Sequence, residues 1–230
     1  MYRLSCIFTV ICALVLHVSA AIALCVRKKQ NWNPILLGAL TFVFFQVFMR
    51  LPIIQILLPK YSWYIVMSSA QPVLYALFLG STAALFENGG RYLVMSLFLK
   101  TQRNAADGIA FGIGHGGIEA ILLAGIKGVA MLISPVEFDV PGIIAASGVE
   151  RLSAMLFQIA LSVMVMKSVR EKKIIWLIAA FTLHTLVDFA VVLAAQSVNV
   201  WVLEAVLFIF SGCMGWFALN QYRKEIIPLT

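Results

Sequence analysis

Three pairs of ionisable residues, each with its partners four positions apart, lie within long apolar stretches of this sequence. They are Glu87 and Arg91 in "FENGGRY", His115 and Glu119 in "GIGHGGIEA", and His184 and Asp188 in "FTLHTLVDF". On a helix, this spacing places both members of a pair on one face. A carboxylate and two imidazoles around a hydrated cavity can activate water for attack on an amide and stabilise the developing oxyanion. The pattern therefore predicts hydrolytic chemistry inside an apolar protein.

The members of these pairs have predicted roles in that chemistry. Glu87 would be the general base, and Arg91, one turn away, would hold it ionised and oriented despite burial. His115 and His184 would bind the nucleophilic water, polarise the scissile carbonyl or protonate the leaving amine. Asp188 would orient His184. The expected substrate is a transmembrane or juxtamembrane peptide, partly unwound so that its carbonyl is exposed.

The elements that must position these residues are membrane-spanning helices. The chain has 230 residues, of which 62% are hydrophobic and 12% charged, and its mean hydropathy is +0.98. Apolar runs of about 20 residues can cross a hydrocarbon core of ~30 Å as helices. We expect one all-α membrane domain over 1–230, with about seven spans at 4–26, 34–58, 70–98, 108–133, 148–168, 174–195 and 200–220.

The first apolar run has a second interpretation, because Arg3 precedes it and "VSAAIA" offers small residues for signal-peptide cleavage. The run continues past those residues to the basic Arg27, Lys28 and Lys29. This continuation favours a retained first span.

Positive charge on alternate sides of the seven spans predicts their orientation. One side has only Arg3 and Lys60. The other collects Arg27, Lys28, Lys29, Lys100, Arg103, Lys167, Arg170, Lys172, Lys173, Arg223 and Lys224. We therefore expect the N-terminus outside and the C-terminus in the cytoplasm. This bias accounts for most of the net charge of +7, so basic character does not indicate nucleic-acid binding.

The depth of the polar residues predicts that the three pairs meet. Counted from the expected cytoplasmic ends of their spans, Glu87 is about 11 residues in, His115 and Glu119 about 7 and 11, and His184 and Asp188 about 10 and 14. At 1.5 Å per residue, these groups lie roughly 10–21 Å deep. The third, fourth and sixth spans therefore present them to a common layer, the predicted active site.

The glycines of the fourth span form a smooth face beside this layer. Gly108, Gly112 and Gly116 recur every four residues next to His115 and Glu119, in a stripe about 60° wide with Gly116 at its border. Such a face lets another helix approach closely, and it would equally let a substrate backbone approach. Gly112 and Gly116 are therefore candidates for substrate binding, with packing as the alternative.

Further polar residues of the fifth span are candidates for substrate binding. Gln158 lies at about the depth of the layer and can both donate and accept hydrogen bonds. Glu150 and Arg151 begin the span at its outer side, where a helix-start or interface role is the alternative. Other isolated polar residues are expected to pack or to reach toward the outer face, as long side chains do near helix ends: His17, Arg50, Lys127 and Glu204.

A metal site is the main mechanistic alternative. His115, Glu119 and His184 would give zinc two imidazoles and one carboxylate, with water in the fourth position. The HExxH motif is absent, so the main expectation is a site without a metal or other cofactor.

The same polar layer also fits two functions of other classes. It would serve a transporter or channel that relays protons or binds a small solute. It would also serve a non-catalytic membrane scaffold or immunity protein that binds a peptide. The sequence leaves the substrate, the scissile bond and the oligomeric state open.

The motifs resemble those of a known superfamily. Its members, the CAAX-prenyl-protease and bacteriocin-processing group of glutamic-type intramembrane proteases, carry E-E-x3-R, F-x3-H and H-x3-N/D. The matching residues here are Glu87-x3-Arg91, Phe111-x3-His115 and His184-x3-Asp188, in the same order. The layout, "GIGHGGIEA" and "GVERL" are most similar to the YhfC-like branch of bacterial membrane proteins, described as intramembrane peptidases related to the multipass scaffold subunit of γ-secretase.

The resemblance implies a glutamic-type intramembrane protease in the plasma membrane of a bacterium. One departure concerns the doubled glutamate of the superfamily, which is Phe86 followed by Glu87 here. The second acid is then either supplied by Glu119 or missing. If it is both missing and needed, the chain would bind a substrate without cleaving it.

Overall fold

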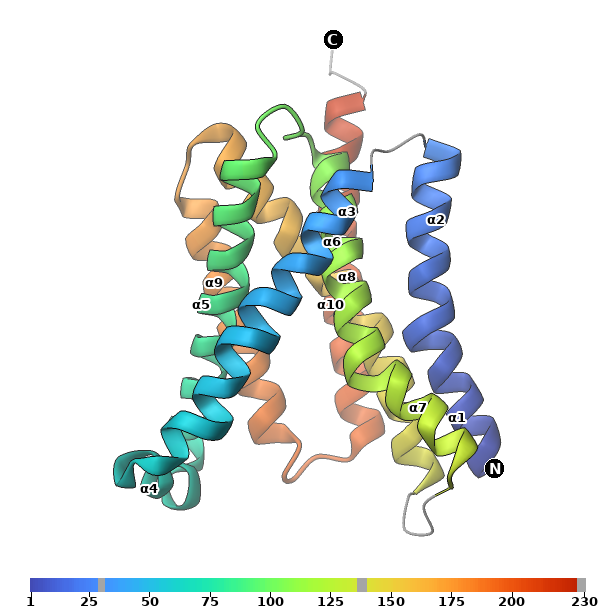
Figure 1. The fold of residues 1–230 in the computed structure, drawn as a ribbon, viewed down its shortest axis with the longest axis vertical. Helices are drawn as coiled ribbons and strands as arrows, with labels where there is room; N and C mark the ends of the chain where they lie inside the picture. Colours follow the sequence, from blue (N-terminus) through green and yellow to red (C-terminus); the bar gives the residue numbers. More distant parts are fainter. Residues whose placement is uncertain (29–31, 136–139, 227–230) are drawn as a thin grey trace.

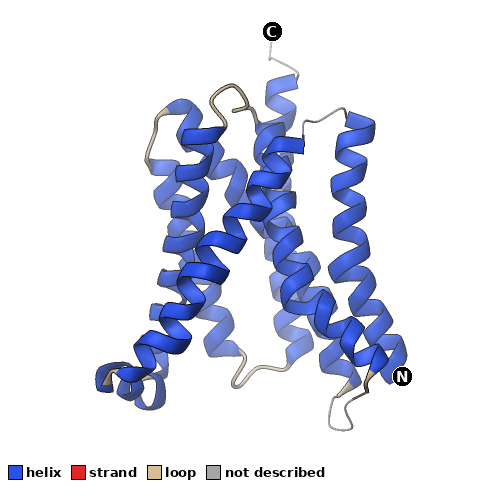
Figure 2. Cartoon of the chain, viewed as in Figure 1, coloured by secondary structure: helices blue, strands red, loops and turns tan. Residues whose placement is uncertain are grey.

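All regular structure in the described residues, 1–28, 32–135 and 140–226 of the computed structural model, is helical (Figure 1, Figure 2). Six helical spans of these ranges are long and apolar enough to cross a membrane, and a bent pair of helices brings the number to as many as seven. The prediction of an all-α, polytopic membrane protein is confirmed.

The first two spans are continuous helices with π-helical segments. The first comprises α1 (Tyr2–Val10), η1 (Ile11–Val15) and α2 (Leu16–Lys28). The second comprises α3 (Trp32–Thr41), η2 (Phe42–Arg50), η3 (Ile53–Leu57) and the short 3-10 turn η4 (Leu58–Lys60). A π-helical turn holds one extra residue and rotates the helix face that follows it.

The remaining spans carry most of the polar layer. They comprise α4 (Ser62–Ala70) with α5 (Pro72–Phe98), then α6 (Ala105–Ala120), η5 (Ile121–Gly125) and α7 (Ile126–Ile133), followed by α8 (Pro141–Glu171), α9 (Ile175–Ala194) and α10 (Val200–Ile226). A capping box begins α6, where the Asn104 side chain accepts from the Asp107 N–H at 2.8 Å and the Asp107 carboxylate accepts from the Asn104 N–H at 3.2 Å.

One predicted boundary is wrong, and one helix was not predicted. The third span begins at Pro72, close to the predicted position 70, but it is preceded by the unpredicted α4, which meets α5 at an angle of 114°. The fifth span begins at Pro141 rather than at 148, so the second half of the predicted 134–147 loop is helical. Positions 136–139 of that loop lie outside the described residues.

The predicted orientation assumes that successive spans run in opposite directions, and the positions of the helix ends agree with this. The C-terminal ends of α2, α5, α8 and α10 lie at one end of the bundle, and the N-terminus and α4 lie at the other (Figure 1). The basic positions predicted to face the cytoplasm fall at the first end, except that Lys29 lies outside the described residues. The orientation in a membrane stays a prediction.

Glycines allow α6 to pack closely between α3 and α8. A Cβ atom at Gly114 would overlap the backbone carbonyl oxygen of Ile35 in α3, and one at Gly112 would overlap the Cα atom of Ile159 in α8. A Cβ at Gly116 would lie 3.1 Å from the Cβ of Gln158. Of the two expected uses of this glycine face, the structure therefore shows close helix approach, and α8 occupies the face.

Candidate intramembrane active site

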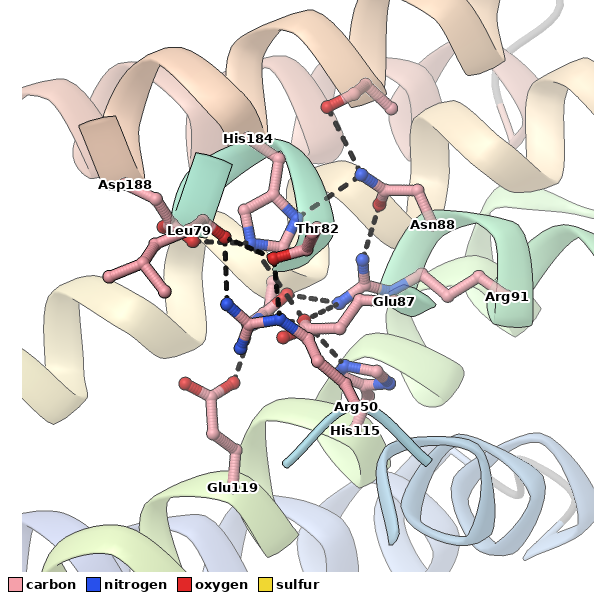
Figure 3. A network of polar contacts seen from close by, with 12 residues as sticks. Arg50, Leu79, Thr82, Glu87, Asn88, Arg91, His115, Glu119, His184 and Asp188 are labelled. Atoms are coloured by element: carbon pink, nitrogen blue, oxygen red, sulfur yellow. Dashed lines mark hydrogen bonds and ion pairs between the residues drawn. The ribbon is translucent and has the colours of Figure 1, made fainter. Parts of the chain in front are cut away.

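Glu87 of α5 lies at the centre of a buried polar network (Figure 3). Its Oε2 atom is 3.1 Å from His115 Nε2, 3.1 Å from Gln158 Nε2 and 3.4 Å from Arg91 Nη2. The side chain is only 5% exposed. These contacts all end on Oε2, so within the described residues Oε1 is left to accept a hydrogen bond from a bound molecule.

Arg91 ties three polar side chains of the network together. It is fully buried and donates to Glu87, to Asn88 Oδ1 at 2.5 Å and to Gln158 Oε1. A buried carboxylate needs such a partner, because an unpaired charge in an apolar interior is costly. The predicted Glu87–Arg91 pair is therefore present, and it is part of a larger set of hydrogen bonds.

Glu119 of α6 joins Glu87 through an amide bridge. Gln158 Nε2 lies 2.6 Å from Glu119 Oε2 as well as 3.1 Å from Glu87 Oε2, so one amide group donates to both carboxylates. Arg151 Nη1 lies 3.2 Å from Glu119 Oε1, and the same guanidinium also donates to Glu150. The three predicted residues of α8, Gln158, Arg151 and Glu150, are therefore brought to the site together with Glu119.

His184 of α9 presents its two ring nitrogens to different partners. Its Nδ1 atom is 3.2 Å from Asn88 Nδ2. Its Nε2 atom is 3.6 Å from Asp188 Oδ2 and 4.0 Å from Glu87 Oε2, and neither distance is that of a good hydrogen bond. The two members of the predicted His184–Asp188 pair therefore lie close together, with Asp188 on the Nε2 side of the ring, but they form no short hydrogen bond.

His115 is enclosed by aromatic rings. Phe42 meets it edge-on with ring centroids 5.3 Å apart, and Phe111, one turn before it on α6, stacks on it at 6.5 Å. The side chain is completely buried and its Nδ1 atom has no hydrogen-bond partner among the described residues. The ring is therefore fixed with Nε2 toward Glu87.

A cavity of about 180 Å³ opens onto this network. A volume of this size accommodates several water molecules. The polar residues that line it include Arg50, Glu87, Glu119, Gln158, His184 and Asp188. A second cavity of about 270 Å³ lies between α1, α7 and α8, and it shares Glu150 and Arg151 with the first.

Glu87, His115 and Glu119 are arranged so that they could hold a metal ion. Each offers one ligand atom, and the three atoms lie within 4.8 Å of one another in a buried setting. Two carboxylates and one imidazole form a donor set that suits zinc, and catalytic zinc sites commonly use three protein ligands. The residues therefore fit a metal. Glu87 stands where the sequence predicted His184 as the third ligand.

Two residues of the site were not predicted. Asn88 follows Glu87 and shares a helix face with Arg91, but a single asparagine in an apolar helix gives no sign of its partner. Arg50 was expected to reach toward the outer face, and this is wrong: it is 7% exposed and donates to Thr82 Oγ1 and the Leu79 carbonyl oxygen. The π-helical segment η2 ends at Arg50.

Of the other three isolated polar residues, Glu204 and His17 are buried and Lys127 is exposed. Glu204, also expected to reach outward, is buried on α10 at 6% exposure. His17 is buried as a packing residue would be, and Lys127 is exposed and lines the second cavity.

Comparison with known proteins identifies relatives of the chain. A family model described as "YhfC intramembrane metalloprotease" matches residues 12–140 and 139–207. The uncharacterized membrane protein YhfC of Bacillus subtilis (strain 168) is 30% identical over 154 residues, which are 55% of this chain and 60% of the relative. The chain thus spans about 60% of that relative's length. No solved structure matches it significantly. The chain belongs to the YhfC intramembrane metalloprotease family.

Proposed function

We propose that the chain is an intramembrane endopeptidase that hydrolyses a membrane-embedded or juxtamembrane peptide bond. The observation that carries this proposal is Glu87, a buried carboxylate that two imidazoles approach and that lines a cavity within the spans. The family description supports peptide hydrolysis. The substrate must unwind locally, because a carbonyl inside a regular helix is already hydrogen-bonded.

Glu87 acts as the general base in this proposal. The Oε1 atom accepts a proton from a water molecule in the cavity while the water oxygen bonds to the carbonyl carbon and the carbonyl electron pair moves to oxygen. The C–N bond then breaks, and the proton on Glu87 passes to the leaving amine. Arg91 and Gln158 hold the carboxylate through Oε2 during both steps.

The two histidines have different tasks. His184 lines the cavity, so its ring can donate a hydrogen bond to the oxyanion of the tetrahedral intermediate. His115 is completely buried, with Nε2 held at Glu87, so it orients the base. Glu119 serves as the second acid, held by Gln158 and Arg151.

A metal ion, when bound, would be held by Glu87, His115 and Glu119. It would activate its own water as a nucleophile and polarise the scissile carbonyl. Arg91 and Arg151 would then still hold the two carboxylates. In that form Glu87 and Glu119 would be ligands, and the peptide bond would be bound in the same cavity.

The substrate path and the setting complete the proposal. A peptide with its scissile bond in the smaller cavity can extend past Glu150 and Arg151 into the larger one, because both residues line both cavities. The partners are therefore the bilayer and a membrane peptide. The protein would lie in a bacterial plasma membrane with its C-terminus in the cytoplasm.

The test is cleavage of membrane peptides by the purified protein in liposomes. Glu87→Gln and His184→Gln should abolish product formation while the protein remains folded. Glu204→Gln is the matched control, because Glu204 is a buried acid that lines neither cavity described above. Equal cleavage by wild type, Glu87→Gln and His184→Gln would refute the proposal, and proton-coupled solute uptake would favour a transporter.

A further inference from the structure

The orientation of the Asn88 side-chain amide is determined by its neighbours. Arg91 can only donate, so the Asn88 atom 2.5 Å from Arg91 Nη1 must be the oxygen. The Ala180 carbonyl oxygen can only accept, and it lies 3.3 Å from the other atom of the amide. That atom is therefore the nitrogen, and a flip of the amide would place donor against donor and acceptor against acceptor.

This orientation determines the tautomer of His184. The Asn88 amide nitrogen lies 3.2 Å from His184 Nδ1. Because the amide nitrogen donates, Nδ1 must accept with its lone pair. A neutral imidazole carries one N–H and one acceptor nitrogen, so the proton of His184 is on Nε2.

The N–H at Nε2 points to the side of the ring where the acids and the cavity lie. The nearest described carboxylate oxygens, of Asp188 and Glu87, are 3.6 and 4.0 Å away, which leaves Nε2 without a short hydrogen bond. The ring itself is buttressed edge-on by Phe157, with centroids 5.8 Å apart. The donor is therefore held in place and is available to an oxygen atom in the cavity.

We propose that Asn88 is a positioning residue that keeps the proton of His184 on Nε2, so that His184 donates to the reacting oxygen and is not a metal ligand. A metal ligand needs a free lone pair, and here the amide uses that of Nδ1 while Nε2 carries the proton. The three buried residues that could hold a metal, Glu87, His115 and Glu119, do not include His184, which agrees with this. In this proposal Asn88, and not Asp188 as the sequence predicted, orients His184. The part that concerns a reacting oxygen rests on the proposed function.

Nitrogen NMR of the full-length protein tests the tautomer directly. The chain has only three histidines, so protein labelled with ¹⁵N-histidine can be assigned with His17→Gln and His115→Gln. In chelator-treated wild type in lipid or detergent, we expect the His184 signals of a protonated Nε2 and an unprotonated Nδ1. A protonated Nδ1 with an unprotonated Nε2 would overturn the proposal.

Two substitutions at Asn88 extend the test. Asn88→Asp keeps an oxygen for Arg91 but replaces the donor at Nδ1 by an acceptor, so the proton should move to Nδ1. Asn88→Leu removes all three hydrogen bonds of the Asn88 side chain, so the two tautomers should mix. Ser162→Ala is the control for a small change in the core, because its buried hydroxyl has no partner among the described residues, and it should leave the His184 signals unchanged.

Peptide cleavage gives an independent readout. Asn88→Asp should lower kcat by roughly 100-fold or more, with a smaller change in KM, because a donor to the oxyanion is lost. An unchanged kcat with a reversed tautomer would refute the positioning role. If Asn88→Asp does not fold, the wild-type spectrum still decides the tautomer. The expected spectrum in a protein that cleaves no peptide would refute the proposed function and leave the tautomer established.

Discussion

Removing the Arg91 guanidinium should destabilise the fold strongly, and Arg91→Met is the substitution that removes it with little change in length. The guanidinium is completely buried and contacts Glu87, Asn88 and Gln158. Its loss leaves a buried carboxylate without its neighbouring cation and two neutral acceptors without a donor. A buried pair that loses one member costs more than a pair that loses both.

The magnitude follows from the distances. At 3.4 Å between Glu87 Oε2 and Arg91 Nη2, the attraction is about 5 kcal/mol for an effective dielectric constant of about 20. Part of this is recovered when His115 and Gln158 adjust, so the net loss should be roughly 3–5 kcal/mol. Arg50→Met is the matched control. It removes donors from only two neutral oxygens, at 3.2 and 2.8 Å, and should cost about 1–2 kcal/mol.

Unfolding by SDS in mixed micelles, followed by helicity, measures both losses. The double variant Glu87→Gln/Arg91→Met separates charge from packing, because it removes both charges of the pair and leaves neither one without the other. It should be more stable than the sum of the two single losses implies, by roughly 1–3 kcal/mol. Strict additivity, or an equal loss in Arg91→Met and Arg50→Met, would refute the idea that Arg91 compensates the charge of Glu87.

Three further predictions concern the packing, the metal and the orientation. Gly114→Ala should lower the free energy of unfolding by about 1–3 kcal/mol or more in the same assay, because the added Cβ would overlap the backbone of Ile35. Gly89→Ala is the control: an added Cβ there has no atom within 4 Å, so this variant should be neutral or more stable by about 0.5–1 kcal/mol. Similar losses in the two variants would contradict the α3–α6 contact. Glu119→Gln should lower the amount of bound zinc, measured by metal analysis after equilibrium dialysis, while Glu150→Gln should leave it unchanged. Equal zinc in the two variants would show that Glu119 is not a ligand. A protease-sensitive tag on the C-terminus should be cut only in inverted membrane vesicles, and cutting in intact cells would reverse the predicted orientation.

The sequence predicted the polar layer because helix geometry is nearly constant. A rise of 1.5 Å per residue converts positions in a span into depth, and this was enough to bring Glu87, His115 and His184 together before any contact was known. The family resemblance to YhfC is likewise confirmed. The wider relation to CAAX-type proteases stays a prediction.

The partners of each atom could not be predicted in the same way. Spacing places Asp188 on the same face as His184, but which ring nitrogen it meets depends on how α5 and α9 pack. Asn88 reaches His184 across that interface, 96 positions away in the chain. Gln158 was placed at the right depth, yet its bridge between two carboxylates depends on the rotation of α8 against α6.

Incorporation of heavy oxygen into a peptide product tests the central claim most directly. Wild-type protein in liposomes made with ¹⁸O-labelled water should produce a new carboxyl terminus that carries one ¹⁸O atom, detected by mass spectrometry. Glu204→Gln should do the same, and Glu87→Gln should not. Labelled product at the wild-type rate from Glu87→Gln would contradict the assignment of Glu87 as the base that activates water.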